Sequence, residues 1–308
     1  MEKRLKRSEL TFSLAFLLTL VIAVGAFFYG VKVGTARVED KYASEEQPAA
    51  ESAAPALPNS YQQQDLVSFY HTVFLPYREF QNEWFDVESK WLADSSADRT
   101  ADLNGLAKSA RKKYDAIKTV GVSKASPLLV DAQTSYLKSL KLFADSFSEV
   151  AKDANSQAAD AFLKSLNENA YFKEGRVQAL SGQRDYYGSM LKWAAMIDTD
   201  LPSDYESPDI LSLSKWKSLP LIIKLKVSAD YLSKQSEMKP FSPQDLTVRI
   251  DDFISSGQAD KRKLKSFGAI AELLTSADGV RGGDFLAMKI RYYENEQLPQ
   301  LPFFYSDK

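Results

Sequence analysis

The sequence predicts an all-α protein with one N-terminal transmembrane helix, a spacer, an extracytoplasmic up-down helical bundle and a second, irregular helical part. Three observations predict this order. An uncharged apolar run lies close to the N-terminus, a stretch rich in Ala, Glu, Ser and Pro follows it, and long segments with apolar residues three and four positions apart come next. No segment shows the alternation of apolar and polar residues that a half-buried strand needs.

The apolar run "LTFSLAFLLTLVIAVGAFFYGV" covers residues 10–31 without a charge. At about 1.5 Å of rise per residue, this run forms a helix long enough to cross a hydrocarbon core of about 30 Å. The apolar core of a secretory signal is usually only about 7 to 15 residues long and ends at a cleavage site of small residues. We therefore expect a transmembrane helix over residues 10–34 that the mature protein keeps.

Four basic side chains among the first seven residues set the expected orientation of this helix. Because basic flanks stay on the cytoplasmic side, residues 1–9 are predicted to be cytoplasmic and the rest of the chain extracytoplasmic. Small residues recur at every fourth position, at Ala26, Gly30 and Gly34. Such a face lets two anchors pack closely, which would give a homodimer, although small residues are also common in membrane helices without any such role.

Amino-acid composition limits the kinds of protein to which the predicted extracytoplasmic part can belong. Beyond residue 37 the chain has 33 basic and 39 acidic side chains, a net charge of −6, which does not suggest a nucleic-acid surface. The absence of cysteine excludes disulfides, thiol nucleophiles and zinc–thiolate sites. None of the seven asparagines lies in a glycosylation acceptor motif. Together these features favour a protein of a bacterial cell envelope, located in the cell membrane.

Residues 35–60 are predicted to be a disordered spacer, because their composition buries too little apolar surface. Residues 61–198 are predicted to form a four-helix bundle with coiled-coil-like heptad spacing and short connections. Pro76 is expected to kink or restart the first helix. The four helical stretches run from Leu66 to Trp91, over about 100–120, from Pro127 to Ala154, and over about 157–197.

Residues 199–308 are predicted to form the second helical part. An acidic loop at 198–209 leads from the bundle into its helices. Ser207-Pro208 and Ser242-Pro243 have the pattern of an N-cap followed by proline in the first turn, and Asp245 completes a capping box. The Lys-rich stretch at 260–267 is interpreted as the solvated face of a helix. Five helices are expected, near 208–218, 220–238, 243–256, 260–277 and 282–295.

The C-terminal segment "LPQLPFFYSDK" combines two prolines with a cluster of apolar and aromatic residues. A cluster of this kind is not expected to stay in water. Two alternatives follow: the segment folds back into a groove between the last helices, or it binds a partner. The partner-binding residues would be Leu301, Phe303, Phe304 and Tyr305.

No catalytic motif, metal site or cofactor site is predicted, since the chain has one histidine, His71, and no cysteine. The favoured function is a non-enzymatic interaction or scaffold module, whose partner is an envelope protein or cell-wall material. The alternative is a small-molecule binding or sensing module that signals through a partner protein. It would need a cavity of about 300 Å³ or more in the bundle core. An enzyme, the third class, would need two carboxylates and a basic residue in one cleft.

Overall fold

A computed structural model of the protein describes residues 60–305, which belong to one compact unit. This part of the chain is all-α, as predicted: between Ser60 and Tyr305 there is no strand, only an isolated antiparallel bridge that joins Ser212 and Ser266. None of the helices in this range is long and apolar enough to span a membrane. The predicted transmembrane helix at 10–34 and the packing face at Ala26, Gly30 and Gly34 lie outside the described residues.

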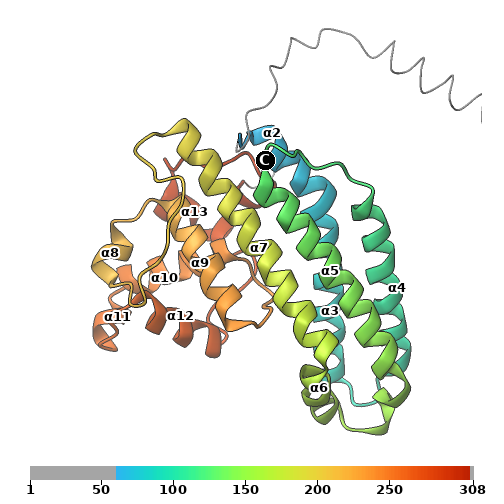
Figure 1. The fold of residues 1–308 in the computed structure, drawn as a ribbon. Coiled ribbons are helices and arrows are strands. Elements are labelled where there is room, and N and C mark those ends of the chain that lie inside the picture. Colours follow the sequence, from blue (N-terminus) through green and yellow to red (C-terminus); the bar gives the residue numbers. More distant parts are fainter. Residues whose placement is uncertain (1–59, 306–308) are drawn as a thin grey trace, which may run out of the picture. The chain divides into compact units, whose positions relative to one another are not determined.

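The first part of the described chain is a bundle of long helices that lie side by side (Figure 1). The helical bundle expected from the heptad spacing is therefore present. Its elements are α2 (Gln63–Phe69), the π-helical turn η1 (Tyr70–Phe74), α3 (Leu75–Ala93), α4 (Arg99–Lys118), α5 (Pro127–Val150), the 3-10 helix η2 (Ala151–Ser156), α6 (Ala159–Glu168) and α7 (Ala170–Ile197).

The interruption expected at Pro76 takes the form of a π-helical turn directly before it. The N–H of Leu75 bonds to the carbonyl of Tyr70, five residues earlier, instead of four. Pro76 then lies in the first turn of α3, directly after this wider turn. The wider turn thus lets one helical stretch continue past the proline.

The fourth predicted helix, expected to be continuous over 157–197, is instead two helices. Asn169 has an extended backbone (φ −63°, ψ 129°), and its side-chain oxygen accepts a hydrogen bond from the N–H of Phe172 at 3.0 Å. Asn169 therefore ends α6 and is the N-cap of α7. Asparagine is among the preferred N-cap residues, so the sequence carried a local signal for this break that apolar spacing alone did not show.

Aromatic rings fill the bundle core. Trp84 of α3 stacks on Phe147 of α5 with ring centroids 5.4 Å apart, and Phe143 stacks on Phe147 at 5.8 Å. Two glycines of α7 let α5 approach closely: a methyl group added at Gly175 or Gly182 would lie 3.0 to 3.3 Å from a ring of α5. The rings of α5 therefore pack directly on the backbone of α7.

The second part packs against the other side of α7, so that α7 lies between it and α5 (Figure 1). Helix α9 lies along α7, and α10 packs on α9, α12 and α13. The elements are α8 (Leu213–Lys217), α9 (Leu221–Gln235), α10 (Pro243–Ser255), α11 (Gln258–Lys261), α12 (Phe267–Ser276), α13 (Asp284–Tyr293) and the 3-10 helix η3 (Pro302–Phe304).

Of the two predicted N-cap and proline pairs in this part, Ser242-Pro243 is confirmed, with a capping box completed by Asp245. The helix start predicted at Ser207-Pro208 is wrong, because α8 begins only at Leu213, after the N-cap Ser212. The backbone before α8 pairs with a distant segment instead: the N–H of Phe267 donates to the carbonyl of Leu211 at 2.9 Å. A long-range bond here prevails over the local helix signal.

The single helix predicted over 260–277 is also wrong. Helix α11 ends at Lys261, Lys263 adopts a left-handed backbone conformation (φ 56°), and α12 begins at Phe267. The Lys-rich stretch is therefore a largely exposed turn between two helices and not one helix face.

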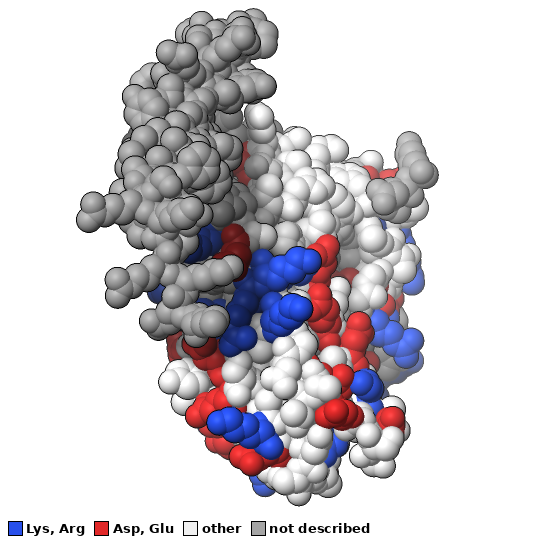
Figure 2. All heavy atoms as spheres, turned by 90° about the vertical axis from the view of Figure 1, so that its right-hand side faces the viewer, with Lys and Arg blue, Asp and Glu red and all other residues white. Residues whose placement is uncertain are grey.

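Charged residues on the α4 side of the bundle are of both signs. Figure 2 shows basic and acidic residues as neighbours over this face. Ion pairs connect α4 to α3: Lys90 with Asp102 at 2.8 Å, and Lys113 with Glu79. The charges of this face therefore serve in part to join neighbouring helices.

Candidate functional site

The C-terminal segment folds back onto the helices, as the first of the two alternatives expected. Leu301 and Phe304 are fully buried, while Phe303 and Tyr305 are half-buried. The ring of Phe303 lies 5.6 Å from that of Tyr70 in η1, and the ring of Phe304 lies 5.6 Å from that of Phe285 in α13. The segment thus bridges the start of the bundle and the last long helix. Partner binding by these four residues stays a prediction.

Lys289 of α13 fastens this segment. Its ammonium group donates a hydrogen bond to the carbonyl of Phe304 at 2.9 Å and lies 3.7 Å from the centre of the Tyr305 ring. Burial lowers the pKa of Lys289, but its two contacts favour the charged form. The polar contacts of the segment are therefore made within the chain.

The outer face of α13 presents large apolar side chains to solvent. Ile290 is 79% exposed and Leu286, one turn earlier, is 38% exposed, whereas Phe285, which points away from them, is buried. We call Leu286, Ala287 and Ile290 the α13 surface. Leu286 also lines a groove of about 250 Å³ together with Phe74, Arg78 and Phe303. Exposed apolar residues one helical turn apart are a typical recognition feature of a helix.

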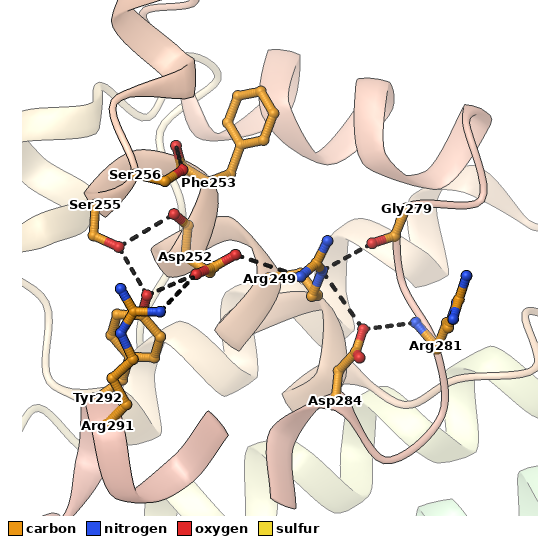
Figure 3. Close-up of polar contacts among 10 residues, drawn as sticks. All are labelled: Arg249, Asp252, Phe253, Ser255, Ser256, Gly279, Arg281, Asp284, Arg291 and Tyr292. Carbon is orange, nitrogen blue, oxygen red and sulfur yellow. Dashed lines mark hydrogen bonds and ion pairs between the residues drawn. The ribbon is translucent and has the colours of Figure 1, made fainter. Parts of the chain in front are cut away.

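A polar cluster centred on Asp252 holds α13 against α10 (Figure 3). The hydroxyl of Tyr292 donates to Asp252 at 2.7 Å, and the guanidinium of Arg291 lies 3.5 Å from the same carboxylate. Arg249 pairs with Asp252 at 3.4 Å and with Asp284, at the start of α13, at 3.6 Å. Contacts at both ends of α13 therefore fix which face it turns outward.

Between the helices of the bundle core lies a space too small for a ligand. The space found between its helices, beside Tyr77, Tyr136 and Gln183, measures about 10 Å³. Tyr77 and Tyr136 have pKa values raised by burial, and Tyr77 shares a 2.7 Å hydrogen bond with Ser139. These hydroxyl-bearing rings serve packing. This space is far smaller than the core cavity that a binding module would need.

A polar pocket of about 260 Å³ opens instead where the bundle meets the second part. We call it the Arg176 pocket. Its walls come from α3, α6, α7, the loop between α9 and α10, and the turn before α13. It is lined by Trp84, Phe85, Glu88, Ser89, Asn167, Phe172, Arg176, Glu237, Met238, Lys239, Pro240 and Asp278.

Charged groups in the Arg176 pocket are incompletely paired. Arg176 donates one hydrogen bond from Nη1 to Asn167 at 3.0 Å, while its buried Nε has no partner. Its guanidinium lies 5.3 Å from the Phe172 ring centre. Glu88 makes no hydrogen bond or ion pair within the described residues. Glu237 pairs only with Lys239, at 3.0 Å.

Partial burial shifts the pKa values of charged groups in the Arg176 pocket. Loss of hydration raises the pKa of Glu88, nearby Glu237 raises it further, and Arg176 partly offsets both. Loss of hydration also lowers the pKa of Arg176. Two carboxylates and a basic group thus share one cleft, as an enzyme would need.

Between residues 60 and 305, no group of three or more His, Asp or Glu side chains is placed to hold a metal ion. Comparisons with protein-family models, with curated proteins and with solved structures gave no match for this chain.

Proposed function

We propose that the protein is a membrane-tethered, non-enzymatic interaction module of a bacterial cell envelope. In this proposal residues 10–34 anchor the chain in the cell membrane, residues 35–60 are a spacer, and the helical unit outside the cytoplasm binds another envelope protein. Cell-wall material and a second copy of the chain are the other partners considered.

The α13 surface carries this proposal. Ile290 and Leu286 are exposed on a helix whose opposite face is buried and whose two ends are held by the Asp252 cluster. A rigid helix loses little conformational freedom on binding, which favours its use as a contact. The adjoining groove beside Phe303 offers space for an apolar side chain of the partner. We therefore infer that the partner contributes an apolar protein segment.

The membrane tether supports this function by raising the local concentration of the helical unit. An anchor confines the unit to the membrane surface, which raises its effective concentration for partners there without any new contact. For a flexible spacer of residues 38–60 the r.m.s. span is about 25 to 30 Å. Weak contacts by a small apolar surface then suffice.

Photo-crosslinking in cells tests the proposal. A photoreactive amino acid is placed at Ile290 of the full-length protein, and at Glu272 of α12, an exposed polar position, as the control. We expect an adduct of one defined mass from position 290 and none from position 272. The adduct should weaken when Leu286→Asp is added and when residues 1–34 are removed.

Each outcome has a defined meaning. An adduct of twice the chain mass would identify a second copy as the partner. Adducts of equal yield from both positions, or no adduct from position 290, would overturn the proposal. Equal melting temperatures of the purified L286D variant and the parent protein are required as the folding control.

A small-molecule binding module is the second candidate function. The space beside Tyr77 and Tyr136 in the bundle core is too small for a ligand, but the incompletely paired charges of the Arg176 pocket favour this candidate.

A further inference from the structure

The Arg176 pocket contains charges that folding leaves unpaired. An incompletely hydrogen-bonded charged group away from bulk water costs free energy unless a partner satisfies it. Arg176 has a buried Nε without a partner, and the partly buried Glu88, whose pKa is raised by loss of hydration, makes no hydrogen bond among the described residues. The two groups make no ion pair with each other. A ligand with both an anionic and a cationic group would satisfy both.

We propose that the Arg176 pocket binds a small zwitterion, an α-amino acid with an apolar side chain. This proposal rests on the pocket alone and is independent of the anchor and of the α13 surface.

Arg176 is suited to the carboxylate of such a ligand. A guanidinium presents its N–H donors as a planar fork that matches a carboxylate and binds it through two parallel hydrogen bonds. Stacking on the Phe172 ring and the bond to Asn167 fix the plane of the guanidinium. The other guanidinium N–H groups of Arg176, which lines the pocket, are then available to one incoming anion.

Glu88 and Glu237 are suited to the ammonium group. Both carboxylates line the same pocket as Arg176, and Asp278 adds a third. Burial raises the pKa of Glu88, so an incoming cation would relieve the cost of its ionised form. Lys239 offsets only part of this negative charge, through its pair with Glu237.

Aromatic and apolar residues are suited to the ligand's side chain. Trp84, Phe85, Met238 and Pro240 contribute apolar walls. The volume of about 260 Å³ is below that of pockets for drug-sized molecules, which begin at about 300 Å³. A single amino acid is therefore the appropriate size.

Calorimetric titration of the full-length protein in detergent micelles tests this proposal. The probes are L-leucine, N-acetyl-L-leucine, which lacks the ammonium group, and L-leucinamide, which lacks the carboxylate. We expect L-leucine to bind with a Kd of about 1 mM or tighter. Each of the other two should bind about tenfold more weakly, because each loses one charge-assisted contact.

Substitutions of single residues test whether L-leucine binds in the Arg176 pocket. Arg176→Gln and Glu88→Gln should each weaken L-leucine binding about tenfold, whereas Arg111→Gln on the exposed face of α4 should leave it unchanged. Glu88→Gln removes a poorly hydrated carboxylate, so its protein should be at least as stable as the parent. Lost binding in that variant therefore cannot come from unfolding.

Two results would overturn the proposal. One is equal affinity for L-leucine and its two derivatives, and the other is no heat of binding up to about 10 mM. Either result would leave the interaction function unaffected, because the crosslinking test uses another surface.

Discussion

Asp251 and Asp252 are neighbours in α10 with different surroundings. The side chain of Asp251 is 12% exposed and accepts hydrogen bonds from Trp216 at 2.6 Å, from Lys224 at 2.7 Å and from the hydroxyl of Tyr293. Burial, with Asp251 as a second cause, raises the pKa of Tyr293. The partners of Asp252 are more accessible to water. The two positions thus separate a buried polar hub from a surface cluster.

Asp251→Ala should destabilise the protein by about 3 to 5 kcal/mol, because it leaves the buried ammonium of Lys224 without its partner. Asp252→Ala should cost about 1 kcal/mol or less, since Arg249 and Arg291 can turn to solvent. Urea unfolding followed by circular dichroism measures both values. Equal losses in the two variants would contradict the assignment of Asp251 as the hub.

Glu88 makes stability depend on pH in a defined direction. Burial raises its folded-state pKa, so the folded chain holds the proton more tightly than the unfolded chain. The stability this provides is fully present below the ordinary carboxylate pKa and is lost as pH rises through the raised value. At neutral pH the ionised Glu88 therefore opposes folding.

Glu88→Gln should accordingly raise the melting temperature at pH 7, and the gain should vanish near about pH 4. Differential scanning calorimetry at several pH values measures it. Glu83→Gln, on an exposed position of the same helix, is the matched control and should show no such gain. A gain from Glu88→Gln that persists at the acidic end would show that its cause is not the titration of Glu88.

Helix α7 carries much of the packing and is the element that apolar spacing described least well. Val177 is apolar but 41% exposed, whereas Gly175 and Gly182 are buried against rings of α5. Glycine has no apolar side chain, so its use as a packing surface leaves no hydrophobic pattern. Helix α9 is a second packing partner of α7, so α7 is buried on more than one side.

Gly182→Ala should therefore destabilise the bundle by about 1 to 3 kcal/mol, because its methyl group would lie 3.0 Å from the buried Tyr136 ring. Gly105→Ala is the control. Gly105 is exposed within α4 with nothing within 4 Å of an added methyl group, so alanine should stabilise it by about 0.5 to 1 kcal/mol. Chemical denaturation should show changes of opposite sign in the free energy of unfolding for the two variants. Stabilisation by both substitutions would contradict the close approach of α5 and α7.

Short sequence patterns predicted helix boundaries correctly where residues close in the sequence determine the local structure. Ser242-Pro243 with Asp245 starts a helix, since the cap bonds lie within one turn. Leu211 is different, because its carbonyl bonds to a residue more than fifty positions away. The Arg176 pocket could not be predicted for the same reason: its charged residues lie on separate elements that only the fold brings together.

The whole described unit depends on contacts between its two parts. Helix α7 packs on α5 and on α9, and the hydroxyl of Tyr187 in α7 donates to Gln244 of α10. The C-terminal segment adds a second connection, because Phe303 lies among rings of η1 and α7 while Phe304 lies against α13. We therefore expect the two parts to unfold together.

Removing the segment after Gln297 tests this dependence. The shortened chain would lose Leu298, Leu301 and Phe304, all buried. At about 1.5 to 3 kcal/mol for each buried side chain, the loss is about 5 to 9 kcal/mol. That is comparable with the whole stability of a typical domain, about 5 to 15 kcal/mol, so most of the protein should unfold at far lower temperature.

A version ending at Tyr305 keeps these buried side chains and is the matched control, expected to melt like the full chain. Thermal unfolding followed at 222 nm by circular dichroism compares the three proteins, with one cooperative transition expected for each that folds. If the chain ending at Gln297 melted like the full chain, the segment would not be part of the core, and its aromatic residues would be free to bind a partner. If it unfolds as expected, loss of a partner in that version reports lost folding, so Phe303 and Tyr305 must be tested by single substitutions.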